Sequence, residues 1–284
     1  MERTGLLPDS GFYLRAEPTN EEVLTESRSR NNLVLEMAVN PPETQTDHKI
    51  RSTTLAGLLI SVQRVVKHAY GRAFRELAPS LKSEIHRADA HVLNVMVPAK
   101  PGSFRVLCEG AHSPGLMGES ELSRALAIVT ALFARVDEPR AAVDVVKAYK
   151  GHLAAAYLSL LNFLIEIDSN LACSWAEPEF SAARSFAISR KEVQPIIDLA
   201  STIASLTEET ITLTGALMKV DVDRGTWRLE DAEHEHSGQT RDGGPSLAGL
   251  TTGLRYSFNC LEEYSETETG REVRHLKLIS FQPA

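Results

Sequence analysis

Apolar residues recur at intervals of three and four positions through the first two thirds of the chain, which is the spacing of helices with one buried face. Shorter runs rich in Val and Leu predict a strand at 32–40, which Pro41 ends, and a hairpin over 91–110. Two further short strands or extended loops are expected at 171–178 and 184–189. The spacing predicts helices over 52–77, 119–136, 140–168 and 190–206.

The last of these helices carries a recognisable start signal. Ser189 and Glu192 match a capping box, in which each side chain satisfies a backbone N–H at the first turn. Pro195 lies beyond the favoured first turn, so a kink or a late start is expected there. Residues 1–30 show neither spacing and are expected to form a flexible arm.

The apolar spacing changes from three or four positions to two near residue 207, which is typical of strands. The alternation slips after Gly215, where a β-bulge would reset the buried face. Short strands and Gly-containing turns then predict a five-stranded barrel or sandwich, SH3-like or OB-like. The SH3-like form is favoured because 240–253 shows no helix of the OB type.

The resulting fold class is α+β, with a mixed helix and sheet domain followed by a small all-β barrel. The predicted domains are the arm at 1–30, the mixed domain at 31–206 and the barrel at 207–284.

Charge and cysteine content narrow the functional classes. The formal net charge is −8 and the pI about 5.6, which disfavours nucleic acid or an anionic membrane as a partner. Cys108, Cys173 and Cys260 are too far apart for a disulfide scaffold or a structural zinc site, and they fit a reducing, bacterial-type cytoplasm. The N-terminus lacks the apolar run of a signal peptide, and the apolar stretch 153–167 is too short to span a bilayer.

Three residues are the weak candidates for catalysis. Cys108 and His112 lie close in sequence, and a Cys–His pair can supply a thiolate and its base. Core packing is the favoured interpretation of Cys108, because it alternates with Val106. Glu177 lies near Trp175, and an aromatic neighbour can raise a carboxyl pKa.

Two histidines are the weak candidates for metal binding. His234 and His236 would project from the same face of a strand, as two ligands of one ion do. A third ligand would have to come from elsewhere, so an exposed strand or loop is the favoured interpretation. The Gly-rich stretch 243–253 lacks the spacing of a phosphate-binding loop, and no cofactor is expected.

The leading hypothesis is a non-catalytic cytoplasmic binding or regulatory protein whose barrel recognises a protein partner. An antitoxin, defence-related or adaptor role fits this hypothesis. The alternatives are nucleic-acid binding through a basic, aromatic-lined groove on the barrel, or a hydrolase without a local motif. The candidate binding residues on the barrel are Trp227, Arg228, Arg255 and Tyr256.

Overall fold

The computed structural model describes residues 18–47, 50–77, 90–96, 104–111, 119–203, 206, 208–232, 234–266 and 272–284. Contacts divide the chain into two compact units. The first, here called the sheet unit, comprises residues 1–148 and 156–203. The second, here called the barrel unit, comprises residues 149–155 and 204–284, so its C-terminal part begins close to the predicted boundary at 207.

The sheet unit is built on five antiparallel strands in the order β2-β3-β1-β4-β5. The central strand β1 is buried along almost its whole length, as expected of a strand covered on both faces. The predicted strands and hairpin are confirmed in this sheet. Their bounds are β1 Leu33–Val39, β2 Leu93–Met96, β3 Phe104–Gly110, β4 Leu171–Ala176 and β5 Arg184–Ile188.

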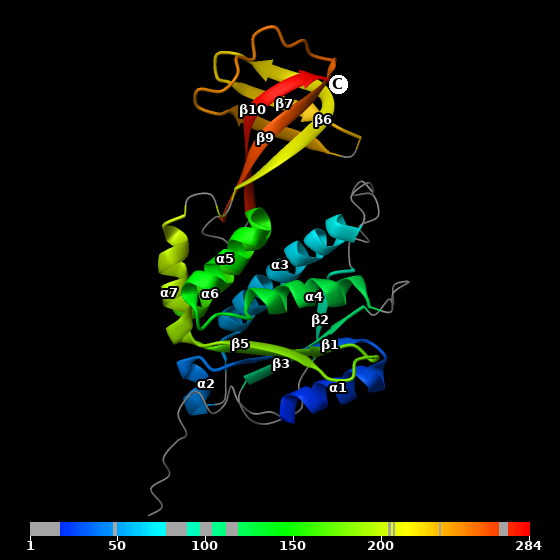
Figure 1. The fold of residues 1–284 in the computed structure, drawn as a ribbon, viewed down its shortest axis with the longest axis vertical. Helices are drawn as coiled ribbons and strands as arrows, with labels where there is room; N and C mark the ends of the chain where they lie inside the picture. Colours follow the sequence, from blue (N-terminus) through cyan, green and yellow to red (C-terminus); the bar gives the residue numbers. More distant parts are fainter. Residues whose placement is uncertain are drawn as a thin grey trace, which may run out of the picture. The chain divides into compact units, whose positions relative to one another are not determined.

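Helices cover both faces of this sheet, with α3 and α4 on one side and α1 on the other (Figure 1). The predicted helix at 52–77 is confirmed with the same bounds in α3 (Ser52–Leu77). α4 (Glu121–Leu132) begins after the N-cap Ser120. α7 (Arg190–Ser201) has the predicted capping box, in which the Ser189 N–H donates to the Glu192 carboxylate at 2.6 Å.

Two segments differ from the sequence prediction because their apolar signal is sparse. Residues 18–30 were expected within a flexible arm but form α1 (Pro18–Arg30), which packs on β1 and β4. Val23 and Leu24 are its main buried apolar side chains, too few to show a helical period. The polar stretch after β1 contains the short helix α2 (Pro42–Asp47).

The predicted helix over 140–168 is two helices, α5 (Pro139–Tyr149) and α6 (Gly151–Glu166). Where they meet, Lys150 and Gly151 both have positive φ, 43° and 58°, which interrupts the right-handed helical backbone. The Gly151 N–H instead donates to the Leu206 carbonyl at 2.9 Å. The prediction of one helix was therefore wrong. Nothing in the sequence indicated the break, because the apolar period continues across it.

The barrel unit contains a closed five-stranded barrel with β10 beside β8 and the order β10-β8-β7-β6-β9. β8 and β10 are parallel and the other neighbouring pairs are antiparallel. Counted from β6 as the first strand, the order around the barrel is first, second, third, fifth and fourth, and the third and fifth strands are parallel. This is the strand order of an OB-fold, so the preference for an SH3-like barrel was wrong. The strands are β6 Glu208–Asp221, β7 Thr226–Glu230, β8 Glu235–Thr240, β9 Arg255–Glu266 and β10 Glu272–Pro283.

Gly215 marks the point where β6 changes partners. Up to Ala216 the strand pairs with β9, and from Ala216 onward it pairs with β7. The register shift of the β6–β7 pair falls between Leu217 and Lys219, a few residues beyond the predicted position of the bulge. One strand thus pairs with β9 along its first part and with β7 along its second part. The core of the barrel consists of Leu217, Trp227, Leu229, Leu247, Tyr256, Phe258, Cys260, Leu276 and Leu278.

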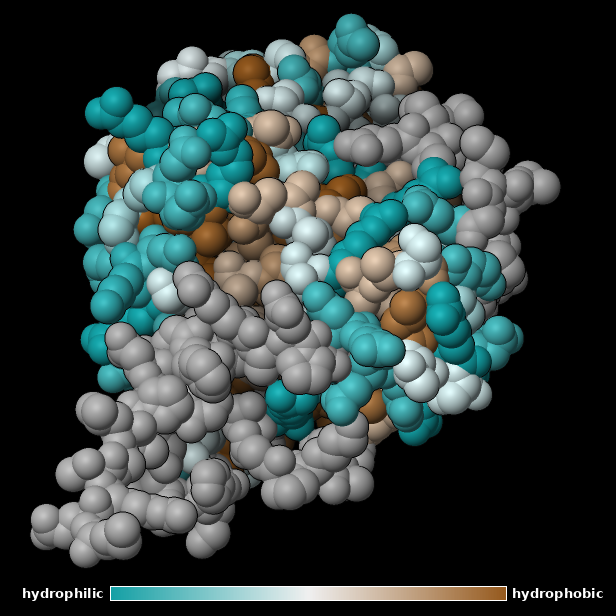
Figure 2. All heavy atoms as spheres, turned by 60° about the horizontal axis from the view of Figure 1, so that its bottom comes forward, coloured by the Kyte–Doolittle hydropathy of each residue, from teal (hydrophilic) through white to brown (hydrophobic). Residues whose placement is uncertain are grey.

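The surface seen from the α1 and α2 side of the sheet unit is mainly hydrophilic around a hollowed area of hydrophobic residues (Figure 2). In this unit, Ala38, Ala172 and Ala187 lie side by side across β1, β4 and β5, and all three are half-buried. Among the helices that the structure describes, none is long and apolar enough to cross a membrane.

Candidate functional site

Two of the four predicted binding residues lie inside the barrel rather than on it. Trp227 is 2% exposed and Tyr256 is 6% exposed. The Trp227 ring packs edge-on against Phe258 with centroids 5.0 Å apart, and the Tyr256 hydroxyl accepts from the Thr251 N–H at 3.1 Å. The aromatic-lined groove expected from these rings is absent from the described surface of the barrel, because both rings belong to its core.

The other two predicted binding residues are on the surface. Arg255 is exposed at the start of β9, and Arg228 lies on the outer face of β7, 3.4 Å from the Glu235 carboxylate. Side chains on this face of β7 and β8 alternate with the buried Trp227 and Leu229, and none of them is aromatic. They are Thr226, Arg228, Glu230, Glu235, Ser237 and Gln239.

His234 and His236 are neighbours, with ring centroids 6.3 Å apart. His236 is held between two other partners, because its Nε2 lies 2.8 Å from Asp231 and its Nδ1 lies 3.3 Å from the Arg274 guanidinium. Within the described part of the chain, the group of three or more potential metal ligands lies elsewhere and includes neither histidine.

Of the predicted Cys108–His112 pair, the structure describes Cys108, and His112 lies outside the described residues. Cys108 is in β3, 1% exposed, and burial raises its pKa to about 12. A thiol with such a pKa carries almost no thiolate near neutral pH, and the thiolate is the nucleophilic form. The position agrees with the expected packing role.

Glu177 anchors the start of α4. It is 0% exposed and accepts a hydrogen bond from the hydroxyl of Ser120, the N-cap residue, whose oxygen accepts from the Ser123 N–H at 3.0 Å. The positive end of a helix dipole stabilises a carboxylate at this place. Trp175, its neighbour in sequence, donates from Nε1 to Thr130 at 2.9 Å. Through these contacts, Glu177 and Trp175 both hold α4 against the sheet, which is a structural role.

We expect all three thiols to be protected in the native protein. Cys108, Cys173 and Cys260 are at most 2% exposed, and burial raises the pKa of each, to about 12 for Cys108 and Cys260. Ellman's reagent near neutral pH should therefore react slowly with the native chain and rapidly with three thiols in guanidinium chloride. A thiol that reacts fast in the native protein and disappears in Cys108→Ser would contradict this placement and favour the hydrolase alternative.

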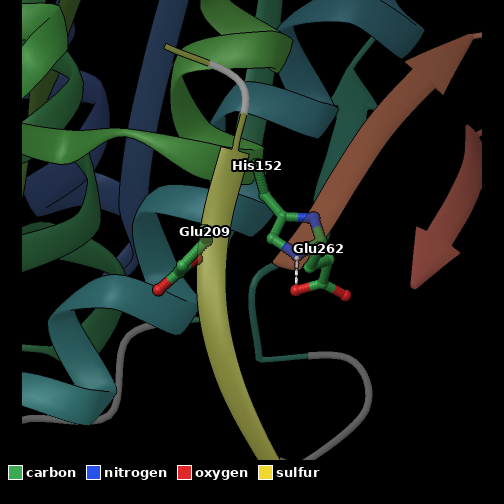
Figure 3. Close-up of side chains that lie close together, drawn as sticks. All are labelled: His152, Glu209 and Glu262. Atoms are coloured by element: carbon green, nitrogen blue, oxygen red, sulfur yellow. Dashed lines mark hydrogen bonds and ion pairs between the residues drawn. The ribbon is translucent and has the colours of Figure 1, made fainter. Parts of the chain in front are cut away.

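A cluster of three other side chains, within the barrel unit, was missed by the sequence analysis. His152, Glu209 and Glu262 each present one nitrogen or oxygen atom within 4.8 Å of the others (Figure 3). Glu209 on β6 and Glu262 on β9 are directly opposite in the antiparallel register. The His152 Nε2 lies 2.9 Å from a Glu262 oxygen. Glu262 is 4% exposed, while Glu209 and His152 are half-buried.

The helix break at Lys150 and Gly151 positions His152 in this cluster. The positive φ of both residues starts α6 at Gly151 and places His152 in its first turn. A Cβ on Gly151 would lie 2.7 Å from an oxygen of Glu209, so that carboxylate lies close against the backbone of the helix break. The sequence contained a partial signal, because Glu208-Glu209 and Glu262-Glu263 are the two acidic pairs that face each other across β6 and β9.

Arg274 on β10 completes the surroundings of Glu262. Its guanidinium donates to the carboxylate oxygen that His152 does not contact. Burial acts to raise the pKa of Glu262, but the hydrogen bonds and charges of His152 and Arg274 outweigh burial and lower it. A carboxylate with a lowered pKa stabilises the fold above its ordinary pKa, and this stabilisation is lost as the pH falls through the lowered value.

No protein-family model matches the chain, and neither the curated proteins nor the solved structures contain a significant match. The OB-type arrangement of the barrel therefore rests on its strand order and pairing alone.

Proposed function

We propose that this chain is a binding protein whose barrel recognises a protein partner, in the manner of an adaptor or regulatory subunit. The observation that supports this most is the charge of the C-terminal segment that forms the barrel. Residues 207–284 contain 14 Asp and Glu against 8 Lys and Arg, so the barrel holds most of the net charge of −8. An acidic surface repels a phosphate backbone and attracts a basic protein segment.

Exposed apolar side chains on the same barrel favour a protein partner. Met218 is 44% exposed and Leu254 is 55% exposed. Their backbones are adjacent, because the Leu217 N–H donates to the Leu254 carbonyl at 2.9 Å and the Gly253 N–H donates to the Leu217 carbonyl at 2.8 Å. Large exposed apolar side chains on neighbouring backbone segments of an acidic barrel suit a partner segment with basic and apolar residues.

The strand order keeps nucleic acid as the second candidate, because OB-folds bind oligonucleotides on the second and third strands. The outer face of β7 and β8 offers no aromatic side chain for base stacking. The one arginine on that face, Arg228, lies beside Glu235. Binding of single-stranded nucleic acid at low salt, lost at higher salt, would favour this alternative over a protein partner.

Met218→Asp and Leu254→Asp should each weaken partner binding by about tenfold, because a charge replaces apolar contact area. The partner would be identified by co-purification from the source cells and mass spectrometry, then purified and titrated against the variants. Ile60→Asp is the matched control, since Ile60 is 52% exposed on α3 of the sheet unit. Unchanged affinity in both barrel variants, with unchanged thermal unfolding, would contradict a role for this surface.

A further inference from the structure

We infer that His152, Glu209 and Glu262 form a binding site for a divalent transition-metal cation such as Zn²⁺ or Mn²⁺. The inference is independent of the proposed partner. An imidazole nitrogen with two carboxylate oxygens is a donor set that these ions accept in proteins. All three residues belong to the barrel unit and lie on three different segments, the first turn of α6, β6 and β9.

The spacing of the donor atoms is close to that of a ligand shell. Two ligands at about 2.1 Å from one ion are about 3.0 Å apart at a right angle and about 3.4 Å apart at the tetrahedral angle. The His152 Nε2 and the Glu262 oxygen are 2.9 Å apart, and all three donor atoms lie within 4.8 Å. Glu209 is half-buried and has a carboxylate oxygen that points away from His152 and Glu262 (Figure 3), so ion binding requires its carboxylate to rotate toward them.

The electrostatics of the cluster favour a cation. Glu209 and Glu262 are directly opposite on neighbouring strands, where like charges repel each other, so a bound cation would add to the compensation that His152 and Arg274 give Glu262. Glu208 and Glu263 form a second acidic pair at the same end of β6 and β9, and Lys277 neutralises Glu263. The ion would take the place of the proton that His152 Nε2 shares with Glu262, and one proton would leave when His152 is the donor.

Arg274 has the position of an outer-shell residue. It holds the Glu262 oxygen that faces away from His152, and this leaves the oxygen beside His152 available to a metal. Outer-shell hydrogen bonds of this kind fix the orientation of ligating carboxylates. The positive charge of Arg274 also repels the bound metal ion, so we expect micromolar rather than nanomolar affinity for the ion.

Isothermal titration of the full chain, stripped with a chelator, with ZnCl₂ and separately with MnCl₂ tests the site. We expect one ion per chain and a higher temperature of barrel unfolding with the ion bound. Glu209→Gln keeps the shape of a half-buried side chain and should lower the affinity at least about tenfold, and His152→Ala should lower it as much. X-ray absorption should show nitrogen and oxygen ligands without sulfur.

Two control variants separate this site from adventitious binding. Glu208→Gln removes an equal charge from the neighbouring position of β6, whose side chain points to the other face. His234→Ala removes the exposed imidazole of the His234–His236 pair. Both should keep the affinity of the native chain. The inference is overturned when neither ion binds, or when His234→Ala abolishes binding that Glu209→Gln and His152→Ala retain.

Discussion

Trp227→Ala should destabilise the barrel unit by about 3–5 kcal/mol, the usual cost of removing a large aromatic side chain from a core. Trp227 is 2% exposed and lies over Gly238, the residue opposite it on β8. A Cβ on Gly238 would come within 2.5 Å of the indole, so the glycine provides the space that the ring fills. Alanine would leave that space empty, and a small barrel has few other contacts to offset the loss.

Hydrogen exchange with mass spectrometry is the suitable measurement, because two units need not unfold in one transition. Peptides from β6 to β10 should lose protection in Trp227→Ala, while peptides from β1 and β4 keep theirs. Trp227→Phe should cost clearly less, since the buried indole N–H has no hydrogen-bond partner among the residues that the structure describes. Arg228→Ala, on the next position of β7, is the surface control. Full protection of the barrel in Trp227→Ala would contradict the buried placement and restore the predicted binding role.

Gly215→Ala is expected to destabilise the barrel by about 1–3 kcal/mol or more, because overpacking against backbone forces the chain apart. A Cβ at this position would lie 2.3 Å from the Glu230 carbonyl oxygen and 3.1 Å from the Asp231 nitrogen. Neither neighbour is a flexible side chain, so β6 itself has to move. The movement would disturb the point where β6 passes from pairing with β9 to pairing with β7.

Gly71→Ala is the matched control for this substitution. Gly71 lies within α3, and a Cβ built there meets nothing within 4 Å. Alanine is favoured over glycine inside a helix by about 1 kcal/mol, so this variant should be neutral or more stable. Calorimetry should be run on both variants and the native chain. We expect a lower unfolding temperature of the barrel in Gly215→Ala and no decrease in Gly71→Ala. An unchanged barrel transition would mean that Gly215 is not confined by the opposite backbone.

The parts of the fold that the sequence predicted are those with a long or regular local signal. The helix Ser52–Leu77 shows many turns of one apolar face, and the strand Leu33–Val39 is an apolar run that only Glu36 interrupts and that prolines follow. The capping box at Ser189 and Glu192 is a local motif whose hydrogen bonds form within one turn. The change to alternating apolar residues predicted a small barrel in the C-terminal part of the chain, and the closed five-stranded barrel confirms it.

The parts that the prediction missed have short or misleading local signals. Among its described side chains, α1 has two buried apolar residues, Val23 and Leu24. The apolar period runs unbroken through the turn at Lys150 and Gly151. Trp227 and Tyr256 were assigned to a binding surface because alternation shows that side chains share a face but does not show which face is inside.

Local periodicity was therefore sufficient for most of the helices and strands and for a small barrel in the C-terminal part of the chain. Strand order is a different matter, because the parallel contact of β8 with β10 and the closing contact of β6 with β9 join residues far apart along the chain. The same long-range pairing brings Glu209 opposite Glu262, and the two positive φ angles before His152 deliver the imidazole. No local pattern predicts these contacts, because they form only when the barrel closes.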